Sequence, residues 1–517
     1  ERVEALRAMA RRFPFLYVPR FYAPVPAESS APPGAPLPPA TAGPRGGQPA
    51  PPRAGQWPWP TAVRPIEPGL PECIEPATIK DLDAVPLPTA PVVPWVETVQ
   101  DRIAIEIMRG CPGRCRFCQS RTLKHPLRYR RVETIVAAAV ESCRNTGYDE
   151  VSLLSLSTSD YPHFEPLVRR MQEVFHPLGV KISLPSLRVN EQLKAVAALM
   201  AEDRRGLTLA PEVARDDMRE QIRKKISNQD LYDGCREAFR HGWQQVKLYF
   251  LCGLPGERIV DLDGIVDMAE TIARIGKETT GHYAKVTASV SNFVPKAHTP
   301  FQWEAQLPLD EVARRQALLR SSVPRKGVEL SWHDAEVSFL EGAMARGDRR
   351  LADVIETAWR SGARFDAWTE CFSLERWLNA FLACGVDPAE IATRPRPVGE
   401  PLPWEHLSSG VSVSYLRAER ERAQRRGQKR GDLQRVEVGS VVVRWHNQDC
   451  FPHGAPTCAA AIATRRAGSV TCGSGHQKCC WPHAKPSPST CPISCNTTVS
   501  RFDPRPPTSA LSNCIVP

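Results

Sequence analysis

Between residues 105 and 120 the sequence reads Ile105-Glu-Ile-Met-Arg-Gly-Cys-Pro-Gly-Arg-Cys-Arg-Phe-Cys-Gln-Ser120. Its three cysteines, Cys111, Cys115 and Cys118, have the spacing C-x3-C-x2-C. Three thiolates are one ligand too few for a closed tetrahedral metal site. They suit a cubane [4Fe–4S] cluster in which cysteines hold three irons and the fourth iron stays open. The stretch therefore predicts an iron–sulfur centre.

A structural zinc site is the alternative, with His125 as a fourth ligand in C-x3-C-x2-C-x6-H. Zinc sites usually present their cysteines in pairs as C-x2-C, and no second pair follows here. The cluster is therefore the favoured hypothesis, which the surrounding sequence has to support.

The spacing, with the aromatic Phe117 just before the third cysteine, resembles the radical S-adenosylmethionine (SAM) superfamily. The resemblance implies a partial (β/α)6 TIM-like barrel of the α/β class. It also implies that the open iron chelates the amino and carboxylate groups of SAM. One electron then breaks the sulfonium C–S bond and gives a 5′-deoxyadenosyl radical. In such enzymes the cofactor carries the hard chemistry, and the protein supplies position and excludes water.

The composition fits a globular protein of more than one domain. The 517 residues are 42% hydrophobic and 24% charged, and the net charge of +10 is too mild to indicate nucleic-acid binding. No apolar run reaches the roughly 18 residues that span a bilayer, and no signal peptide is recognisable. Upstream of residue 430 the cysteines other than the trio are scattered singly, which favours a reducing cytoplasm.

Changes in composition divide the chain into five parts. The linker is rich in Pro, Ala and Gly, and the tail holds eight cysteines without a coherent core. The predicted parts are the tail of an upstream domain (1–23), a disordered or extended linker (24–95), the radical SAM core (96–305), a mainly helical extension (306–420) and a disordered tail (421–517). A resemblance to radical SAM proteins with an N-terminal cobalamin-binding domain implies that 1–23 is the remnant end of a cobalamin-binding-like domain.

Alternating apolar runs and amphipathic segments predict six β/α units in the core. The expected strands are Ile103–Met108, Glu150–Leu156, Lys181–Leu184, Gly206–Ala210, Gln245–Leu251 and Lys285–Phe293. The expected helices are Val132–Asn145, Phe164–Phe175, Asn190–Ala201, Asp216–Lys225, Asp230–His241 and Ile259–Ile275.

Barrel enzymes place their sites at the carboxyl ends of the strands, so the residues that follow each strand are candidates. Ser157 and Asp160 follow the second strand, where the family binds the SAM amino group; a helix cap is the alternative for Asp160. Arg188 follows the third strand and could pair with the SAM carboxylate, or form a surface salt bridge. Glu212 ends the fourth strand and could accept hydrogen bonds from the ribose, or form an ordinary ion pair.

The fifth strand leads into Gly253-Leu-Pro-Gly-Glu257, which resembles the glycine motif that the superfamily places near the adenine. Gly253 and Gly256 let the backbone turn sharply, and Pro255 lies between them. After the sixth strand, Val294 lies where the family's backbone contacts the adenine. His298 could donate a proton, although a structural histidine is favoured. The basic run from Arg420 to Arg430 is interpreted as a solvated helix end and not as an RNA-binding segment.

Segments such as Leu184-Pro-Ser-Leu-Arg188, Thr299-Pro-Phe-Gln-Trp303 and Gly362-Ala-Arg-Phe-Asp-Ala-Trp368 resemble an uncharacterised bacterial family of radical SAM proteins with an N-terminal cobalamin-binding domain. This chain contains no D-x-H-x-x-G cobalamin loop, so cobalamin is expected only through a missing upstream domain. The presence of cobalamin would favour methyl transfer as the reaction.

The leading hypothesis is a radical SAM enzyme acting on an unknown substrate, with a flavodoxin or ferredoxin type of electron donor as partner. The alternatives are a methylthiotransferase acting on RNA or protein, a non-catalytic iron–sulfur electron carrier, and a zinc-stabilised scaffold. A methylthiotransferase would need three further cysteines upstream of Cys111, and only Cys73 is present. Neither a membrane nor a nucleic acid is expected as a partner.

Overall fold

The computed structural model describes residues 1–26, 61–96, 98, 101–184, 206–322 and 327–437, with the backbone of 463–466 and 469–472. The chain divides into two compact units, Glu1–Arg435 and Val436–Pro517. In the second unit, β12 (Ala463–Arg466) pairs antiparallel with β13 (Ser469–Cys472). The expected helix over 190–201 lies outside the described residues, and so does most of the tail. Among the described residues no helix has the length and apolar character needed to span a bilayer.

The N-terminal segment folds around a small apolar cluster of its own. Helix α1 (Arg2–Arg12) and the short 3-10 turn η1 (Pro19–Phe21) precede β1 (Tyr22–Pro26), which pairs antiparallel with β2 (Thr61–Pro65). Ala10 and Phe21 are buried there, together with Leu70 and Ile74 from beyond β2. The predicted domain end at residue 23 therefore falls inside β1.

The second half of the predicted linker packs against the core. Leu82 is 1% exposed, and the carbonyl oxygens of Leu82 and Val85 accept hydrogen bonds of 2.7 and 2.8 Å from the buried guanidinium of Arg130. Arg130 also donates to the carbonyl of Glu106 at 3.1 Å, so one side chain connects the segment to the sheet. Residues 27–60 of the predicted linker lie outside the described residues.

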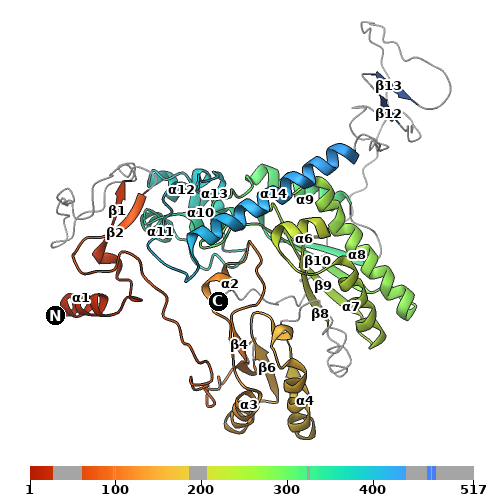
Figure 1. Ribbon diagram of the computed structural model, residues 1–517, viewed down its shortest axis with the longest axis horizontal. Coiled ribbons are helices and arrows are strands. Elements are labelled where there is room, and N and C mark those ends of the chain that lie inside the picture. Colours follow the sequence, from red (N-terminus) through yellow and green to blue (C-terminus); the bar gives the residue numbers. More distant parts are fainter. Residues whose placement is uncertain are drawn as a thin grey trace, which may run out of the picture. The chain divides into compact units, whose positions relative to one another are not determined.

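Seven parallel strands form two sheets (Figure 1). The first has the order β3-β6-β7, and the second has the order β11-β10-β9-β8. In the described part of the chain β7 and β8 are not paired with each other. The strands are β3 (Ile103–Glu106), β6 (Glu150–Leu154), β7 (Lys181–Ser183), β8 (Leu207–Glu212), β9 (Gln245–Cys252), β10 (Lys285–Asn292) and β11 (Val328–Trp332).

All six predicted strands are present, with small shifts at their ends, and the α/β fold class is confirmed. Strand β11 is an addition, since the sequence predicted a mainly helical segment there. It pairs with β10 from Val286↔Val328 to Val290↔Trp332. Leu330 and Trp332 pack against the core beneath it, which explains why this short segment joins the sheet.

Amphipathic helices cover the sheets. In α4, Phe164, Leu167, Val168, Met171 and Phe175 are all buried, and their spacing places them on one face of the helix. The helices of the core are α3 (Val132–Thr146), α4 (Phe164–Phe175), α6 (Asp216–Ile222), α7 (Asn228–Arg240), α8 (Ile259–Thr280) and α9 (Leu309–Ser321). The predicted helical extension contains α10 (Ala335–Arg346), α11 (Leu351–Arg360), α12 (Leu374–Ala383) and α13 (Pro388–Thr393).

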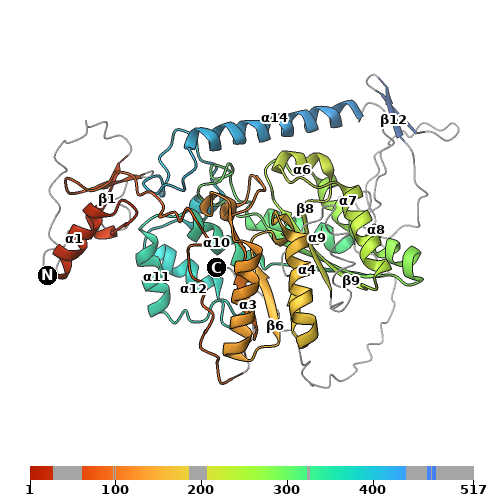
Figure 2. The same ribbon diagram turned by 60° about the horizontal axis from the view of Figure 1, so that its bottom comes forward.

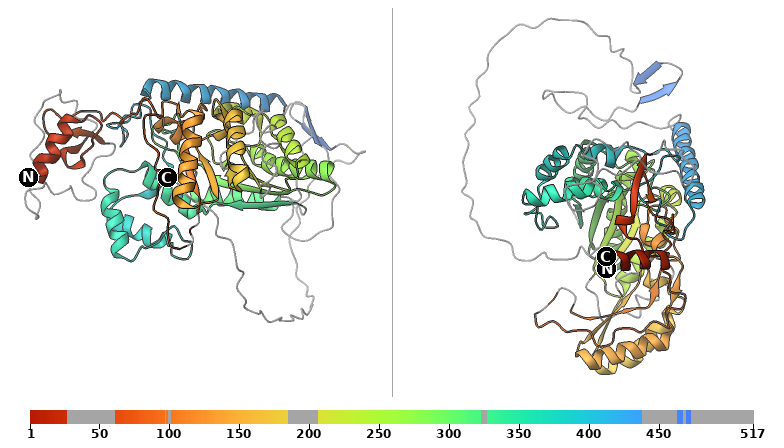
Figure 3. Two further views of the ribbon diagram at one scale, coloured as in Figure 1. Left: turned by 90° about the horizontal axis from the view of Figure 1, so that it is seen from below. Right: turned by 90° about the vertical axis from the view of Figure 1, so that its left-hand side faces the viewer.

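Helix α14 (Val413–Glu437) crosses the boundary that we predicted between residues 420 and 421. Its buried positions, Leu416, Glu419, Ala423 and Arg430, recur at helical spacing and form one stripe. The prediction that the basic run is a solvated helix end is therefore only partly correct, because Arg430 is 4% exposed. The long helix runs past α6 (Figures 2 and 3), which it contacts through Arg426 and Arg430.

Replacing Arg130 by Met should detach the segment around Leu82. The carbonyls of Leu82, Val85 and Glu106 would lose their donor, which should lower the free energy of unfolding by about 1–3 kcal/mol and expose the segment to protease. Urea unfolding and limited proteolysis measure the two effects. The matched control is Arg131→Met, because Arg131 is 79% exposed in its pair with Asp83 and its replacement should change stability much less. Equal effects of both changes would contradict this role of Arg130.

Candidate cluster site

Gly110 starts the cysteine loop. It follows β4 (Met108–Arg109), which pairs antiparallel with β5 (Arg128–Tyr129), so the two ends of the loop lie side by side. Its φ of +99° is unfavourable for any other residue, and a Cβ there would lie 2.9 Å from the carbonyl oxygen of Lys124. The loop geometry therefore requires glycine at this position.

The three cysteines lie on consecutive turns of this loop. The amide of Cys118 donates to the carbonyl of Cys115 at 3.3 Å, and the amide of Gly113 approaches the Sγ of Cys111 at 3.4 Å. All three cysteines are partly exposed, and none of them forms a disulfide. Burial raises the pKa of Cys118, and the nearby Cys111 raises it further. Iron binds the thiolate, so occupation of the site would release these protons.

The thiols do not converge on one point. Among the described residues, no three His, Cys, Asp or Glu side chains are grouped so that they could hold a single metal ion. One tetrahedral zinc would hold two sulfurs about 3.8 Å apart. A cubane has a different requirement, because each cysteine binds its own iron. The donor set of three thiols on one loop fits such a cluster.

Arg116, between the second and third cysteines, connects the loop to α6. Its amide donates to the carbonyl of Ile222 at 3.0 Å, and its guanidinium donates to the carbonyl of Gln221 at 2.5 Å. These carbonyls belong to the last turn of α6, where a cation is favourable. The side chain is buried, and burial lowers its pKa. The buried guanidinium of Arg116 therefore fixes the loop against the last turn of α6.

Glu419 of α14 supplies the counter-charge. Its carboxylate lies 3.1 Å from the Nε of Arg116 and 2.7 Å from Arg223, and it also pairs with Arg422. Burial alone would raise the pKa of Glu419, but these three guanidinium groups lower it overall. A carboxylate that is 1% exposed therefore stays ionised and joins α14 to the cysteine loop.

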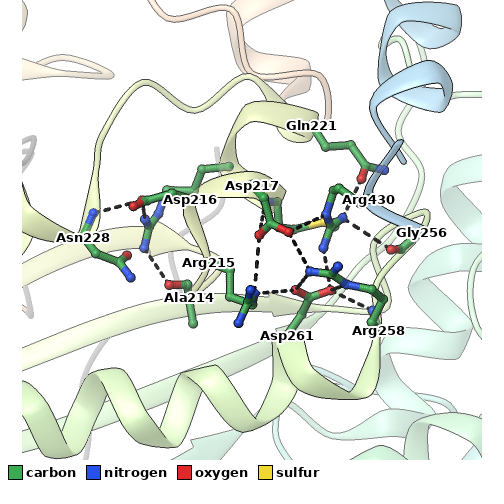
Figure 4. Close-up of polar contacts among 12 residues, drawn as sticks. Ala214, Arg215, Asp216, Asp217, Gln221, Asn228, Gly256, Arg258, Asp261 and Arg430 are labelled. Atoms are coloured by element: carbon green, nitrogen blue, oxygen red, sulfur yellow. Dashed lines mark hydrogen bonds and ion pairs between the residues drawn. The ribbon is translucent and has the colours of Figure 1, made fainter. Parts of the chain in front are cut away.

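Arg430 makes a second connection from α14, to α6 and to the glycine turn (Figure 4). Its guanidinium lies 2.7 Å from Asp261, 3.1 Å from Asp217 and 2.6 Å from the Oε1 of Gln221. It also donates to the carbonyl of Gly256 at 3.4 Å. The amide of Gln221 in turn donates to the carbonyl of Pro255 at 2.7 Å. These contacts position the turn after β9 relative to α6.

The glycine turn itself is closely packed. Gly253 and Gly256 have φ of +92° and +75°, and a Cβ on them would lie 2.9 Å from Leu307 and from Gln221 respectively. The amide of Gly253 donates to Glu257 at 2.8 Å, and Arg315 pairs with the same carboxylate. Burial raises the pKa of Glu257 to about 7, although both partners act to lower it.

The family model of the radical SAM superfamily matches residues 105–269 of this chain. The matched range begins in β3, contains the cysteine loop and the glycine turn, and ends in α8.

Residues 105–269 are a radical SAM domain.

One curated relative is an uncharacterized protein of Methanocaldococcus jannaschii, MJ0966, which is 27% identical over 282 residues. The match covers 54% of this chain and 60% of that protein. Among solved structures, the radical SAM methyltransferase TsrM from Kitasatospora setae is 17% identical, with a TM-score of 0.32 over 38% of this chain and 37% of that one. The cobalamin-dependent SAM radical enzyme OxsB is 14% identical, with a TM-score of 0.32 over 54% and 46%. TM-scores this low carry no argument about this chain.

Two of the residues predicted to contact SAM in the radical SAM domain are held by neighbouring groups. Ser157, 1% exposed, donates to the Oδ2 of Asp160 at 2.5 Å, within the turn that follows β6. Glu212 has a φ of +66° and pairs with Lys224 at 3.0 Å. Both charges of that pair act on the thiol of Cys118, so they lie near the loop. The ion pair expected as the alternative for Glu212 is therefore present, and its contact with ribose stays a prediction.

Apolar side chains line the space beside the loop. Phe117 packs against a buried cluster that includes Leu254, Phe293 and Phe301, and Val294 is buried next to Phe293 in the sequence. The cluster connects the cysteine loop to the glycine turn and to the end of β10. The contacts of Phe117 and Val294 with SAM stay predictions.

Two further candidates have different outcomes. Arg188 lies outside the described residues, so its pairing with a carboxylate stays a prediction. His298 is half-buried with a φ of +58°, and its amide donates to the Oε1 of Gln302 at 2.9 Å. Burial lowers the pKa of His298, which favours the neutral ring.

The sequence interpretation missed Arg116, Glu419 and Arg430. A signal existed only for Arg116, because its place inside the cysteine motif ties it to the cluster loop. The partners of the other two residues are distant in sequence and could not be read from spacing.

Replacing Gly110 by Ala should displace the cysteine loop. The new Cβ would clash with the carbonyl of Lys124 in addition to straining the backbone, so reconstituted protein should hold much less iron and absorb less near 400 nm. Gly147→Ala is the control, because Gly147 has a similar φ of +76° and nothing within 4 Å of the added Cβ. It should cost about 1–3 kcal/mol of stability and leave the iron content unchanged. Equal iron loss in both variants would contradict the steric argument.

The buried Glu257 predicts a pH-dependent stability. Its pKa of about 7 in the folded protein exceeds the ordinary value of 4.5, so folding favours the protonated form. The free energy of unfolding should therefore fall as pH rises from about 4.5 to 7. Glu257→Gln should flatten this fall, as measured by urea unfolding at several pH values.

Glu311→Gln is the control for Glu257, because Glu311 contacts the same Arg315 but its guanidinium partners lower its pKa to about 2. The contribution of Glu311 is present above its unfolded pKa and is lost as pH falls toward 2. Its replacement should therefore leave the slope between pH 5 and 7 intact. A slope that persists in Glu257→Gln would assign the titration to another group.

Proposed function

We propose that this chain is a radical SAM enzyme that cleaves SAM reductively and abstracts hydrogen from a substrate whose identity the sequence does not name. The observation that carries the proposal is the loop with three cysteines that form no disulfide, fixed at the carboxyl end of the first parallel sheet within the matched domain. The chemistry supplied when cluster and SAM are bound is a one-electron cleavage of the C–S bond, giving methionine and a 5′-deoxyadenosyl radical.

The residues of this chain act by holding and orienting. Cys111, Cys115 and Cys118 would each bind one iron, and Gly110 sets their positions. Among the side chains near the loop, Glu212 would accept hydrogen bonds from ribose hydroxyls and Phe117 would lie against the base. Their packing would also keep water away from the reacting carbon, which protects a radical from side reactions.

The turn between β6 and α4 would orient the amino group of SAM. Ser157 donates to the Oδ2 of Asp160, and a carboxylate can accept several hydrogen bonds, including those of an ammonium group. Arg188 would meet the SAM carboxylate, because a guanidinium binds a carboxylate through two parallel hydrogen bonds.

The electron must come from outside the chain, and we propose a donor of the flavodoxin or ferredoxin type. A reducing cytoplasm is the compartment in which free thiols and such a cluster persist. Methyl transfer remains a branch of the proposal that would require cobalamin. No residue of this chain was assigned to cobalamin, so measured cobalamin binding would be needed to support that branch.

Replacing Cys115 by Ala should remove one cluster ligand and abolish the cluster. Anaerobic reconstitution with iron and sulfide should give about four irons per chain in the unmodified protein. Cys115→Ala should lose this iron and the visible absorption. Cys143→Ala is the control, since Cys143 is a partly exposed thiol on α3 outside the loop and should behave as the parent.

Dithionite and SAM then separate the hypotheses. Formation of 5′-deoxyadenosine in the parent and in Cys143→Ala, but not in Cys115→Ala, is the expected result. A stable cluster that leaves SAM intact would instead identify an electron carrier. Zinc at full occupancy in anaerobically purified protein would identify a scaffold.

A further inference from the structure

A strongly cationic pocket lies between α6 and α14, behind the cysteine loop. Its volume is about 610 Å³, and six basic side chains against two acidic ones give its wall a formal charge of +4. The lining residues are Arg116, Glu220, Arg223, Glu419, Arg422, Arg425, Arg426 and Lys429.

Both carboxylates of the pocket are already engaged by its own arginines. Glu419 is shared by Arg116, Arg223 and Arg422, and Glu220 pairs with Arg426. The surplus charge therefore lies on the α14 side. There Arg425 is 63% exposed and lies 3.8 Å from Glu421, and solvent weakens the attraction between these two side chains. Like charges held together in a hollow attract an anionic partner.

The position of the pocket links it to the proposed electron transfer. Arg116 is both a wall of the pocket and the residue between Cys115 and the aromatic Phe117. A molecule bound against α14 would therefore lie next to the loop that holds the cluster. Each SAM cleavage consumes one electron, which has to cross the surface of the protein near this loop.

The composition of the wall favours an acidic protein over a nucleic acid. Single-stranded nucleic acids are held by aromatic side chains that stack on bases, and all eight lining residues are charged. Exposed guanidinium groups on a long helix suit the carboxylates of a protein partner, for which they raise the rate of association more than the affinity.

We propose that this cationic pocket docks the acidic face of a one-electron donor protein beside the cysteine loop. The inference rests on the proposed function. On docking, the donor is oxidised by one electron and the cluster is reduced by one. That electron then enters the C–S bond of SAM, so no further reductant is needed.

The test uses a double charge reversal in the full chain, Arg425→Glu with Arg426→Glu. The matched control is Arg169→Glu with Arg170→Glu on α4, because these arginines are similarly exposed and also pair with glutamates. The probe is a photoreduced flavodoxin. Its Kd is measured at low and high salt, and its rate of cluster reduction is followed by absorbance without SAM. Thermal unfolding of each variant checks that it is folded.

The pocket variant should reduce the second-order rate of cluster reduction by about tenfold at low salt, and the difference should shrink at high salt. Its 5′-deoxyadenosine formation with dithionite should match the parent within about twofold, because a small reductant needs no docking. The control should match the parent with either reductant.

Two results would overturn the docking proposal. One is a flavodoxin rate and Kd that the pocket variant leaves unchanged. The other is loss of binding to a labelled single-stranded RNA in the pocket variant while flavodoxin acts normally, which would make the pocket a nucleic-acid site. Failure of the proposed function gives a different pattern. Dithionite then yields no 5′-deoxyadenosine in the parent, although flavodoxin still binds with the same dependence on charge.

Discussion

The guanidinium of Arg116 is the contact on which the arrangement of this site depends. Taking an arginine out of water is costly unless its charge is paired and its donors are used. Arg116 meets this requirement with Glu419 of α14 and with the last carbonyls of α6, two segments that lie far apart in the sequence. Moving the cysteine loop would leave Glu419 with only its other two guanidinium partners. The position of the loop therefore depends on the pairing of the Arg116 charge as well as on the turns of the loop itself.

Much of the fold follows from sequence patterns because each pattern has a local physical cause. Buried parallel strands are continuous apolar runs, and a helix such as α4 repeats its apolar residues every three or four positions. Two parts could not be predicted in this way. The segment around Leu82 has no periodicity, and its order depends on Arg130, a residue far along the chain. Strand β11 alternates apolar and polar residues over only five positions, too few to distinguish it from a loop.

Sequence patterns likewise predicted only part of the candidate site. Cysteine spacing and the glycines at 253 and 256 were readable, because ligand count and positive φ restrict the residue types that can stand there. The sequence did not predict which polar side chains contact each other. Glu212 pairs with Lys224 and Ser157 with Asp160, and these short-range pairs depend on turns whose geometry the sequence leaves open. The sequence indicated Glu257 only as the end of the glycine motif, whereas its environment depends on Arg315 from α9.

Helix α14 shows why a charged segment can be mistaken for a solvated one. Its buried stripe has the spacing of any amphipathic helix, but the stripe contains Glu419 and Arg430 beside Leu416 and Ala423. A pattern of periodic apolar residues does not reveal a buried face that contains charged residues. The face is buried because it meets complementary polar groups: Arg116 of the cysteine loop pairs with Glu419, and Asp217 and Gln221 of α6 bind Arg430. Arg422, Arg425 and Arg426 lie outside this stripe, and although each pairs with a glutamate their side chains are 49–63% exposed. One basic run therefore serves two purposes, structural on one side of the helix and available for an anionic partner on the other.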